Sequence, residues 1–190
     1  MKCDVILAGV GGQGVLSIAA IIAQAAVSEG FNVRQSEVHG MAQRGGAVLA
    51  HLRISDGKIA GDLIPRGRAD VIISMEPLES LRYVSYLKPA GAMVSAADPL
   101  VNIGNYPQLD EVKKAVMSLP LSRLVNADAL AKEAGNAKAV NMVMVGASSA
   151  FLPIKIKSLE NTIEQTFGSK DSSVVEANKK AFQLGMESVK

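Results

Sequence analysis

Apolar and polar positions along the first part of the chain predict a strand, a tight turn and a helix. A largely apolar run covers residues 4–10 and leads into a cluster of glycines. An alanine-rich apolar stretch follows and ends near residue 28. Short branched runs are typical of buried strands, whereas longer apolar stretches favour helices. We therefore predict a strand over residues 4–10 and a helix over residues 13–28.

The next segments predict an antiparallel part of the sheet. A strand is expected over residues 31–35, and a polar, glycine-rich loop over residues 36–46. Apolar and polar residues then alternate over residues 47–54, and the dipeptide Asp56-Gly57 is a strong hairpin signal. We predict that residues 58–62 form the partner strand of this hairpin. The sheet should then be mixed.

The middle of the chain has the order of strand, helix and strand that is typical of a parallel α/β protein. Residues 70–74 and 91–95 are expected to be strands, with a helix over residues 77–87 between them. The other predicted elements are a helix over 111–117, a strand over 121–125, a helix that Asn126 and Asp128 can cap and that Gly135 stops, a buried helix over 136–151 and amphipathic helices over 159–167 and 174–189. The predicted fold class is α/β. It is one domain, residues 1–190, with three α/β/α layers, a mixed but mostly parallel sheet and a Rossmann-like start.

The glycine cluster is the first candidate site. Gly9, Gly11 and Gly14 have the spacing of a dinucleotide-binding fingerprint between a strand and a helix. Glycine lets the backbone turn tightly and approach a ligand closely, and the N–H groups that open a helix favour a phosphate or carboxylate. Gly12 and Gln13 complete the turn and are candidates for cofactor binding as well. The same pattern can simply pack a helix closely on a strand, so a structural role stays open.

The loop over residues 36–46 is the second candidate site. Its candidate cofactor-binding residues are Glu37, His39, Gln43, Arg44 and Gly45. In an open α/β sheet this loop leaves the carboxyl end of the second strand, where such folds bind ligands, so it should share one crevice with the glycine turn. The planar guanidinium of Arg44 suits a carboxylate or phosphate. Alternatively, Arg44 pairs with Glu37 or with a partner subunit and braces the loop.

Three segments together resemble a known family. They are Gly-Val-Gly-Gly-Gln-Gly at 9–14, Ser-Glu-Val-His-Gly-Met-Ala-Gln-Arg-Gly-Gly at 36–46 and Asn-Met-Val-Met-Val-Gly-Ala at 141–147. They resemble the gamma-type subunit or domain of 2-oxoacid:ferredoxin oxidoreductases, and in particular the beta subunit of the indolepyruvate enzymes. The resemblance covers nearly the whole chain, and the segment at 36–46 is much more specific than the glycine turn.

This resemblance implies a subunit of an enzyme that oxidatively decarboxylates a 2-oxoacid, such as indolepyruvate, to an acyl-CoA. In the family, thiamine diphosphate with Mg and the iron–sulfur clusters lie on a large partner subunit or domain, and electrons pass to ferredoxin. The chain alone is therefore expected to bind no cofactor and to be inactive, and coenzyme A is expected only in the assembled complex. Relatives that use pyruvate or 2-oxoglutarate carry similar motifs. The resemblance identifies no catalytic residue.

Composition argues against several other functions. The 20 basic and 18 acidic residues give a net charge of +2, which is too balanced for a nucleic-acid footprint. Cys3 is the only cysteine, so the chain cannot supply four thiolates to an iron–sulfur cluster, and His39 and His51 are too few for a metal site. We expect Cys3 and His51 to be structural. No apolar run is long enough to span a membrane and no signal-type core begins the chain, so we expect a cytoplasmic protein.

Two functions of other classes stay open. A free-standing dinucleotide-binding dehydrogenase needs an acid at the end of the second strand to hold a ribose, and Glu37 lies near that place. A non-catalytic assembly module would bind no ligand. Co-purification should distinguish these functions. A subunit should co-purify with a large thiamine-containing partner, whereas a dehydrogenase should co-purify with a bound dinucleotide.

Overall fold

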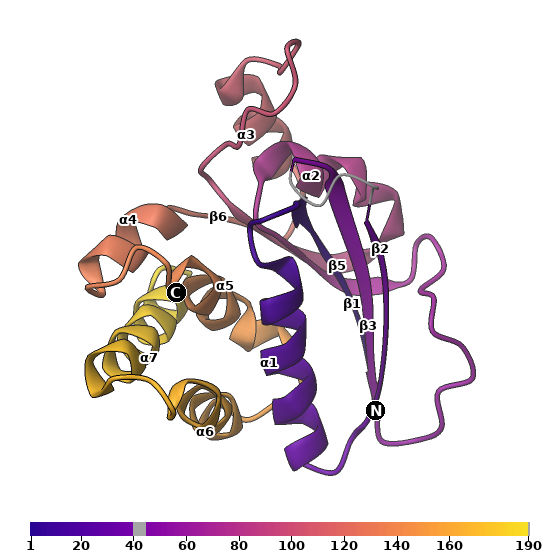
Figure 1. Ribbon diagram of the computed structural model, residues 1–190. Coiled ribbons are helices and arrows are strands. Elements are labelled where there is room, and N and C mark those ends of the chain that lie inside the picture. The colour runs from indigo at the N-terminus through magenta and orange to yellow at the C-terminus, as the bar shows by residue number, and fades with distance from the viewer. Residues whose placement is uncertain (40–44, 190) are drawn as a thin grey trace.

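A mixed sheet of six strands forms the centre of the computed structural model, which describes residues 1–39 and 45–189 (Figure 1). The strands are β1 (Lys2–Val10), β2 (Asn32–His39), β3 (Ala47–Ser55), β4 (Ala69–Ser74), β5 (Leu87–Ala96) and β6 (Ser122–Val125). Their order is β2-β3-β1-β4-β5-β6. Strands β1, β4, β5 and β6 pair in parallel, whereas β3 runs antiparallel to both β1 and β2. The predicted mixed but mostly parallel sheet is confirmed.

Helices cover both faces of this sheet and give the three predicted layers. They are α1 (Val15–Ser28), α2 (Pro77–Arg82), α3 (Leu109–Met117), α4 (Ala127–Glu133), α5 (Val140–Ser148), α6 (Ile156–Phe167) and α7 (Ser172–Glu187), with short 3-10 helices η1 (Val84–Tyr86) and η2 (Ser149–Phe151). Helices α1 and α5 pack on one face, with α6 and α7 outside them, while α2 and α3 cover the other face (Figure 1).

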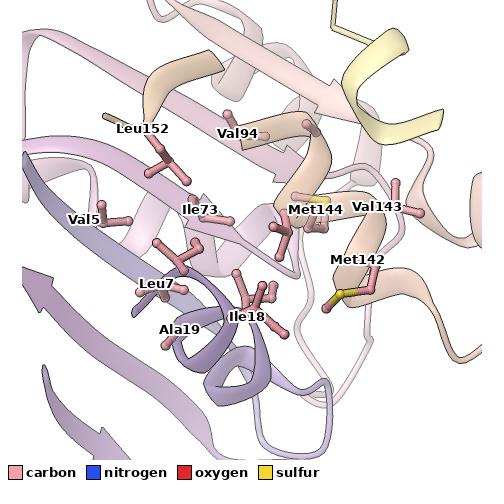
Figure 2. Packing of buried hydrophobic residues seen from close by; sticks show 14 of the residues in the cluster. Val5, Leu7, Ile18, Ala19, Ile73, Val94, Met142, Val143, Met144 and Leu152 are labelled. Atoms are coloured by element: carbon pink, nitrogen blue, oxygen red, sulfur yellow. The ribbon is translucent and has the colours of Figure 1, made fainter. Parts of the chain in front are cut away.

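Alternate side chains of the central strand β1 enter the two cores. Val5 and Leu7 point toward α1 and α5, where Figure 2 shows them beside Ile18 of α1 and Ile73 of β4. Ile6 points the other way, into the smaller core under α2 and α3. This alternation follows from the two-residue period of a strand. Both faces of β1 are therefore apolar, because both are covered by helices.

Helices α5 and α7 cross with their backbones in contact, and two glycines explain why. A Cβ atom at Gly146 of α5 would lie 2.0 Å from the carbonyl oxygen of Phe182 in α7. Reciprocally, a Cβ at Gly185 of α7 would lie 2.0 Å from the carbonyl oxygen of Val143 in α5. Glycine at both positions lets the two backbones touch. The expected burial around residues 136–151 is confirmed for α5, which is buried from residue 142 to residue 148.

The hairpin predicted at Asp56-Gly57 is wrong. Residues 58–62 form no strand, and the antiparallel partner of β3 on its outer side is β2, which was expected to end at residue 35. The reason is that β3 already pairs with β1 along one edge and with β2 along the other, so no edge is free for residues 58–62. This segment instead crosses the sheet as irregular chain, held where Arg53 donates to the carbonyl oxygens of Gly61 and Leu63 at 2.8 and 3.1 Å.

Smaller differences concern the ends of elements. Residues 36–39, predicted as loop, continue β2, and the helix predicted over 77–87 ends at Arg82 and is followed by η1. The helix predicted over 136–151 begins only at Val140 and ends in η2. Boundaries of this kind depend on tertiary pairing and on local hydrogen bonds that the periodicity of the sequence does not contain.

Candidate functional site

The glycine turn has the predicted order of strand, turn and helix. Strand β1 ends at Val10 and α1 begins at Val15, two residues later than expected. Gly12 and Gly14 have φ angles of 102° and 79°, in the left-handed region that residues with a side chain rarely adopt. Gly14 is the N-cap residue of α1. The first N–H groups of this 14-residue helix have no carbonyl partner inside the helix and open toward the turn.

The glycines of the turn differ in the room around them. A Cβ at Gly9 would lie 2.7 Å from Cγ2 of Val15 and 3.1 Å from Cβ of Met75, so this residue lets strand and helix pack closely. A Cβ at Gly14 would lie 2.2 Å from the amide nitrogen of Asn141. A Cβ at Gly12 would meet no atom of residues 1–39 and 45–189 within 4 Å. Gly9 and Gly14 therefore have a packing role in the turn, whereas Gly12 has room beside it among the described residues.

Gln13 holds the turn in shape. Its side-chain Oε1 accepts a hydrogen bond from the backbone N–H of Val10 at 2.8 Å, and its Nε2 donates to the carbonyl oxygen of Met75 at 3.0 Å. The amide thereby ties the end of β1 to the end of β4. The geometry gives Gln13 a bracing role, and a contact with a ligand stays a prediction.

The structure brings the second candidate segment next to this turn. The N–H of Gly11 donates to the carbonyl oxygen of Gly46 at 2.8 Å, and the N–H of Gly45 donates to the carbonyl oxygen of Gly11 at 3.2 Å. The side-chain amide of Asn102 also donates to the carbonyl oxygen of Gly45, at 2.7 Å. The end of the loop over residues 36–46 therefore lies at the same edge of the sheet as the glycine turn.

Three predicted residues of that loop fall wholly or partly outside the described structure. Gln43 and Arg44 lie outside the described residues, as does the side chain of His39, whose backbone ends β2 opposite Val48. The proposed contacts of these side chains, including a pair between Arg44 and Glu37, stay predictions.

Glu37 lies farther from the glycine turn than a ribose-binding acid should. Because β3 is inserted between β2 and β1, Glu37 is two strands away from β1, or roughly 10 Å at the usual spacing of strands. Its exposed side chain receives a hydrogen bond from Gln35 at 3.5 Å. In a dinucleotide-binding fold the acid comes from the strand beside the glycine turn. The strand order therefore argues against the dehydrogenase.

A cleft of about 400 Å³ opens over the glycine turn at the carboxyl ends of the parallel strands. Its lining residues are Gly12, Gln13, Gly14, Met75, Ala96, Asp98, Pro99, Leu100, Asp128, Lys138, Val140 and Asn141. The carboxylate of Asp98 accepts a hydrogen bond from the N–H of Asp128 at 3.2 Å, which joins the end of β5 to the start of α4. Lys138 contributes a cation to a cleft that already faces the N-terminus of α1. Asp98 and Asp128 bring two carboxylates to the same lining, so the part of the cleft that suits an anionic group is the end beside the glycine turn and the first N–H groups of α1.

Most of the polar lining was not predicted. Three charged residues of the lining come from different parts of the chain: Asp98 follows β5, Asp128 lies in the first turn of α4 and Lys138 precedes α5. Only the topology of the fold brings them together. Asn141 carried a signal, because it is the polar exception in an apolar helix and belongs to a segment of the family resemblance. An acid placed just after a predicted parallel strand, such as Asp98, is a second signal that sequence reasoning could have used.

A buried carboxylate anchors the segment that follows β5. Glu76, which is 1% exposed, accepts a hydrogen bond from the hydroxyl of Tyr106, and its other oxygen accepts from the N–H of Glu79 at 2.7 Å and so caps α2. Burial, together with the hydrogen bond to Glu76, raises the pKa of Tyr106, which stays a neutral donor. The Tyr106 contact fixes the far end of the segment whose first residues line the cleft.

Cys3 and His51 occupy buried positions, as expected for structural residues. Burial raises the pKa of the Cys3 thiol to about 12, so it is no thiolate ligand near neutral pH. Nδ1 of His51 accepts a hydrogen bond from the N–H of Ile64 at 3.1 Å, and burial lowers its pKa.

Within residues 1–39 and 45–189, no three side chains of His, Cys, Asp or Glu gather as metal ligands would. None of the helices in this part has the length and apolarity to cross a membrane.

The chain matches the model of the pyruvate ferredoxin/flavodoxin oxidoreductase family over residues 4–188. It is 38% identical over 197 residues to indolepyruvate oxidoreductase subunit IorB of Pyrococcus horikoshii, a match that covers 98% of this chain and 96% of that protein. The gamma subunit of a keto/oxoacid ferredoxin oxidoreductase from Geobacter sulfurreducens is 26% identical, with a TM-score of 0.72 and 98% of each chain covered.

A longer chain shares the fold. The 2-oxoglutarate:ferredoxin oxidoreductase of Magnetococcus marinus, solved with 2-oxoglutarate, coenzyme A and succinyl-CoA bound, has a TM-score of 0.77 at 23% identity, and the match covers 99% of this chain and 31% of that one. The family model and the identity to the archaeal subunit both extend over nearly all of the sequence, and the sheet and its helices agree with those of the solved gamma subunit. The chain therefore belongs to the pyruvate ferredoxin/flavodoxin oxidoreductase family.

Proposed function

We propose that the chain is one gamma-type domain, residues 1–190, and serves as a subunit of an indolepyruvate oxidoreductase. The assembled enzyme would oxidatively decarboxylate an aryl 2-oxoacid to an acyl-CoA and pass electrons to ferredoxin in the cytoplasm. One observation carries the proposal: 38% identity to an indolepyruvate oxidoreductase subunit along 98% of this chain and 96% of that protein.

The donor residues of the chain do not fit the redox cofactors of such an enzyme. An iron–sulfur cluster needs four thiolates or a close substitute, and the single cysteine has its pKa raised to about 12 by burial. The described residues also form no acidic cluster that could hold Mg beside thiamine diphosphate. We therefore assign these groups to a large partner subunit. We assign no step of the chemistry to this chain alone.

The cleft over the glycine turn is the part of the chain that we assign to the ligand. Gly12 leaves open space, α1 presents its first N–H groups and Lys138 adds a positive charge, which together suit a phosphate or carboxylate. Coenzyme A carries such phosphates, and a structural relative was solved with it bound. We propose that Gly11, Gly12, Gly14 and Gly45 shape this anion site, and that Arg44, which lies outside the described residues, serves the active site of the assembled enzyme or its coenzyme A entrance.

Co-expression with the large subunit tests the proposal. The pair should reduce a ferredoxin substitute when supplied with indolepyruvate and coenzyme A, and should turn over pyruvate and 2-oxoglutarate far more slowly. The isolated chain should be inactive and should lack the visible absorbance of an iron–sulfur cluster. Failure to assemble with a thiamine-containing partner, or turnover by the isolated chain, would contradict the proposal.

Arg44 gives a sharper test of the loop. Arg44→Lys keeps the charge but loses the planar pair of donors. If Arg44 binds a ligand, turnover should fall by about tenfold, a loss of roughly 1.4 kcal/mol of transition-state stabilisation, while assembly stays normal. If Arg44 only braces the loop, assembly or stability should fall first. Glu37→Gln, made in parallel, shows whether the two residues act as a pair.

A further inference from the structure

A second hollow, about 420 Å³ in volume, lies on the helical side of the sheet. We call it the helical groove. Its lining residues come from α1, from α5 and the segment before it, and from α6, α7 and the turn that joins them. Its lining residues are Ser17, Ala20, Ile21, Gln24, Asn136, Lys138, Asn141, Met142, Thr166, Phe167, Lys170, Val174 and Asn178. The volume lies within the range of small-molecule sites, which is about 300–1,000 Å³.

The walls of the helical groove are largely apolar. Ile21 of α1 and Met142 of α5 are buried side chains of its lining, and Phe167 and Val174 are half-buried lining residues from α6 and α7. Ala20 of α1 is exposed and lines the groove, so its small side chain leaves space that a larger residue would fill. An apolar body placed here would be removed from water on several sides.

The polar part of the lining has one sign of charge. Among the described residues, Lys138 and Lys170 line the groove, and no Asp or Glu does so. Neither lysine forms an ion pair with any residue in the described part of the chain. An apolar hollow with two cations and several side-chain amides complements an anion that carries an apolar body.

We propose that the helical groove binds a small organic anion, an aryl or alkyl carboxylate, with its body against Ile21 and Phe167 and its carboxylate at Lys170. This site is separate from the cleft over the glycine turn and goes beyond the proposed function. The two share Lys138 and Asn141, which line both hollows. Occupancy of the groove should therefore alter anion binding in the cleft, and by linkage the reverse.

Titration of the isotopically labelled full chain with 3-phenylpropanoate tests the site by NMR. Saturable shifts should appear for residues of α1 and of the turn between α6 and α7. The neutral 3-phenylpropanamide has the same body without the charge, and it should bind about fivefold more weakly, as loss of an exposed ion pair predicts. Equal affinity for acid and amide would overturn the role of the lysines. Shifts located elsewhere, or no saturation, would overturn the site.

Two variants with matched controls locate the ligand. Ala20→Leu fills the groove and should weaken 3-phenylpropanoate binding by about tenfold, whereas Ala115→Leu, at an exposed position of α3, should not. Lys170→Gln should weaken binding by about fivefold, whereas Lys114→Gln on α3 should leave it unchanged. Full binding by Ala20→Leu would overturn the proposal.

The other possible occupant of the helical groove is a segment of the partner subunit. The titration is therefore repeated on the assembled complex. Retained binding supports a small-molecule site, and complete loss on assembly would mean that the groove is a subunit interface and would overturn the proposal. These experiments measure binding and not turnover. Absence of binding in the helical groove would therefore not contradict the proposed function, and an inactive complex would not contradict the proposed binding site.

Discussion

The crossing of α5 and α7 and the turn after β1 both depend on glycine, for different physical reasons. At the crossing, Gly146 and Gly185 have no room for a side chain because a carbonyl oxygen of the facing helix lies 2.0 Å from each missing Cβ. At the turn, Gly12 has free space around it but a φ of 102°. At the crossing, glycine brings two backbones into contact, whereas at the turn it allows a backbone conformation that residues with a side chain rarely adopt.

Gly14 combines both reasons. Its φ of 79° is left-handed, and a Cβ would lie 2.2 Å from the amide nitrogen of Asn141. That nitrogen is the end of a flexible side chain, whereas the atoms facing Gly146 belong to backbone. A side chain can rotate away at modest cost, but a helix backbone can move only with its neighbours. Substitution by alanine should therefore lower the free energy of unfolding most at Gly146, less at Gly14 and least at Gly12.

The largest effect is expected at the helix crossing. Gly146→Ala should lower the free energy of unfolding by about 3 kcal/mol or more, because the new methyl group forces α5 and α7 apart in a well-packed core. Urea denaturation measures this loss. Gly61→Ala is the matched control, since nothing lies within 4 Å of its missing Cβ and its φ is not left-handed. The control should stay within about 0.5 kcal/mol of the wild type. Equal losses would contradict the account of the crossing.

An intermediate effect is expected at the cap of α1. Gly14→Ala should cost about 2 kcal/mol, partly from the left-handed backbone and partly from the contact with Asn141. Asn141→Ala removes the contact and leaves the backbone strain. In a double-mutant cycle, the loss in the double variant should therefore be smaller than the sum of the two single losses by at least about 0.5 kcal/mol. Simple additivity would show that Asn141 gives way without cost.

The open glycine of the turn should show strain alone. Gly12→Ala should cost about 1 kcal/mol of stability, and Gly30→Ala, whose φ of 85° is also left-handed and whose surroundings are also empty, should cost the same. The two positions differ in place, because only Gly12 lines the cleft. In the assembled enzyme, Gly12→Ala should raise the Michaelis constant for coenzyme A while Gly30→Ala leaves it unchanged. Equal constants would remove Gly12 from the proposed anion site.

Local signals in the sequence were enough to predict the turn, the parallel strands and the layers. The run before Gly9, the glycine spacing and the apolar stretch after it are all local, so strand, turn and helix could be placed to within two residues. The hairpin failed for the opposite reason. Asp56-Gly57 is a good turn sequence, but whether a strand follows depends on a free edge beside β3, and β2 occupies that edge.

The candidate site was predictable only where it is local. The glycine turn follows from the local spacing of its residues, whereas its contact with Gly45 comes from the antiparallel pairing of β3 with β1, which places Ala47 opposite Val10. Asp98, Asp128 and Lys138 come from three separate connections, and no pattern in the chain relates them before the sheet order is known. The insertion of β3 beside β1 likewise moved Glu37 away from the position that a dinucleotide site requires.

The smallest effect is expected from the protonation of His51, and it separates glycine packing from electrostatics. Burial lowers the pKa of His51 below its ordinary value of 6.5, with Arg53 adding to the shift and Asp4 opposing it. The folded state therefore favours the neutral ring, whose Nδ1 accepts from the N–H of Ile64. The stability that this provides is present above pH 6.5 and is lost as the pH falls through the folded pKa.

His51→Gln keeps a hydrogen-bond acceptor but cannot titrate. Between about pH 7 and about pH 5, the wild type should lose stability relative to this variant by at most about 1.4 kcal/mol per pH unit, the limit for one proton. The differences between the wild type and the Gly146, Gly14 and Gly12 variants should stay constant over the same range, because steric contact and backbone strain take up no proton. Urea denaturation at several pH values measures both. Parallel curves for wild type and His51→Gln would show that this histidine does not contribute to the acid sensitivity of the fold, and a pH-dependent glycine difference would show that charge contributes where we have assigned packing alone.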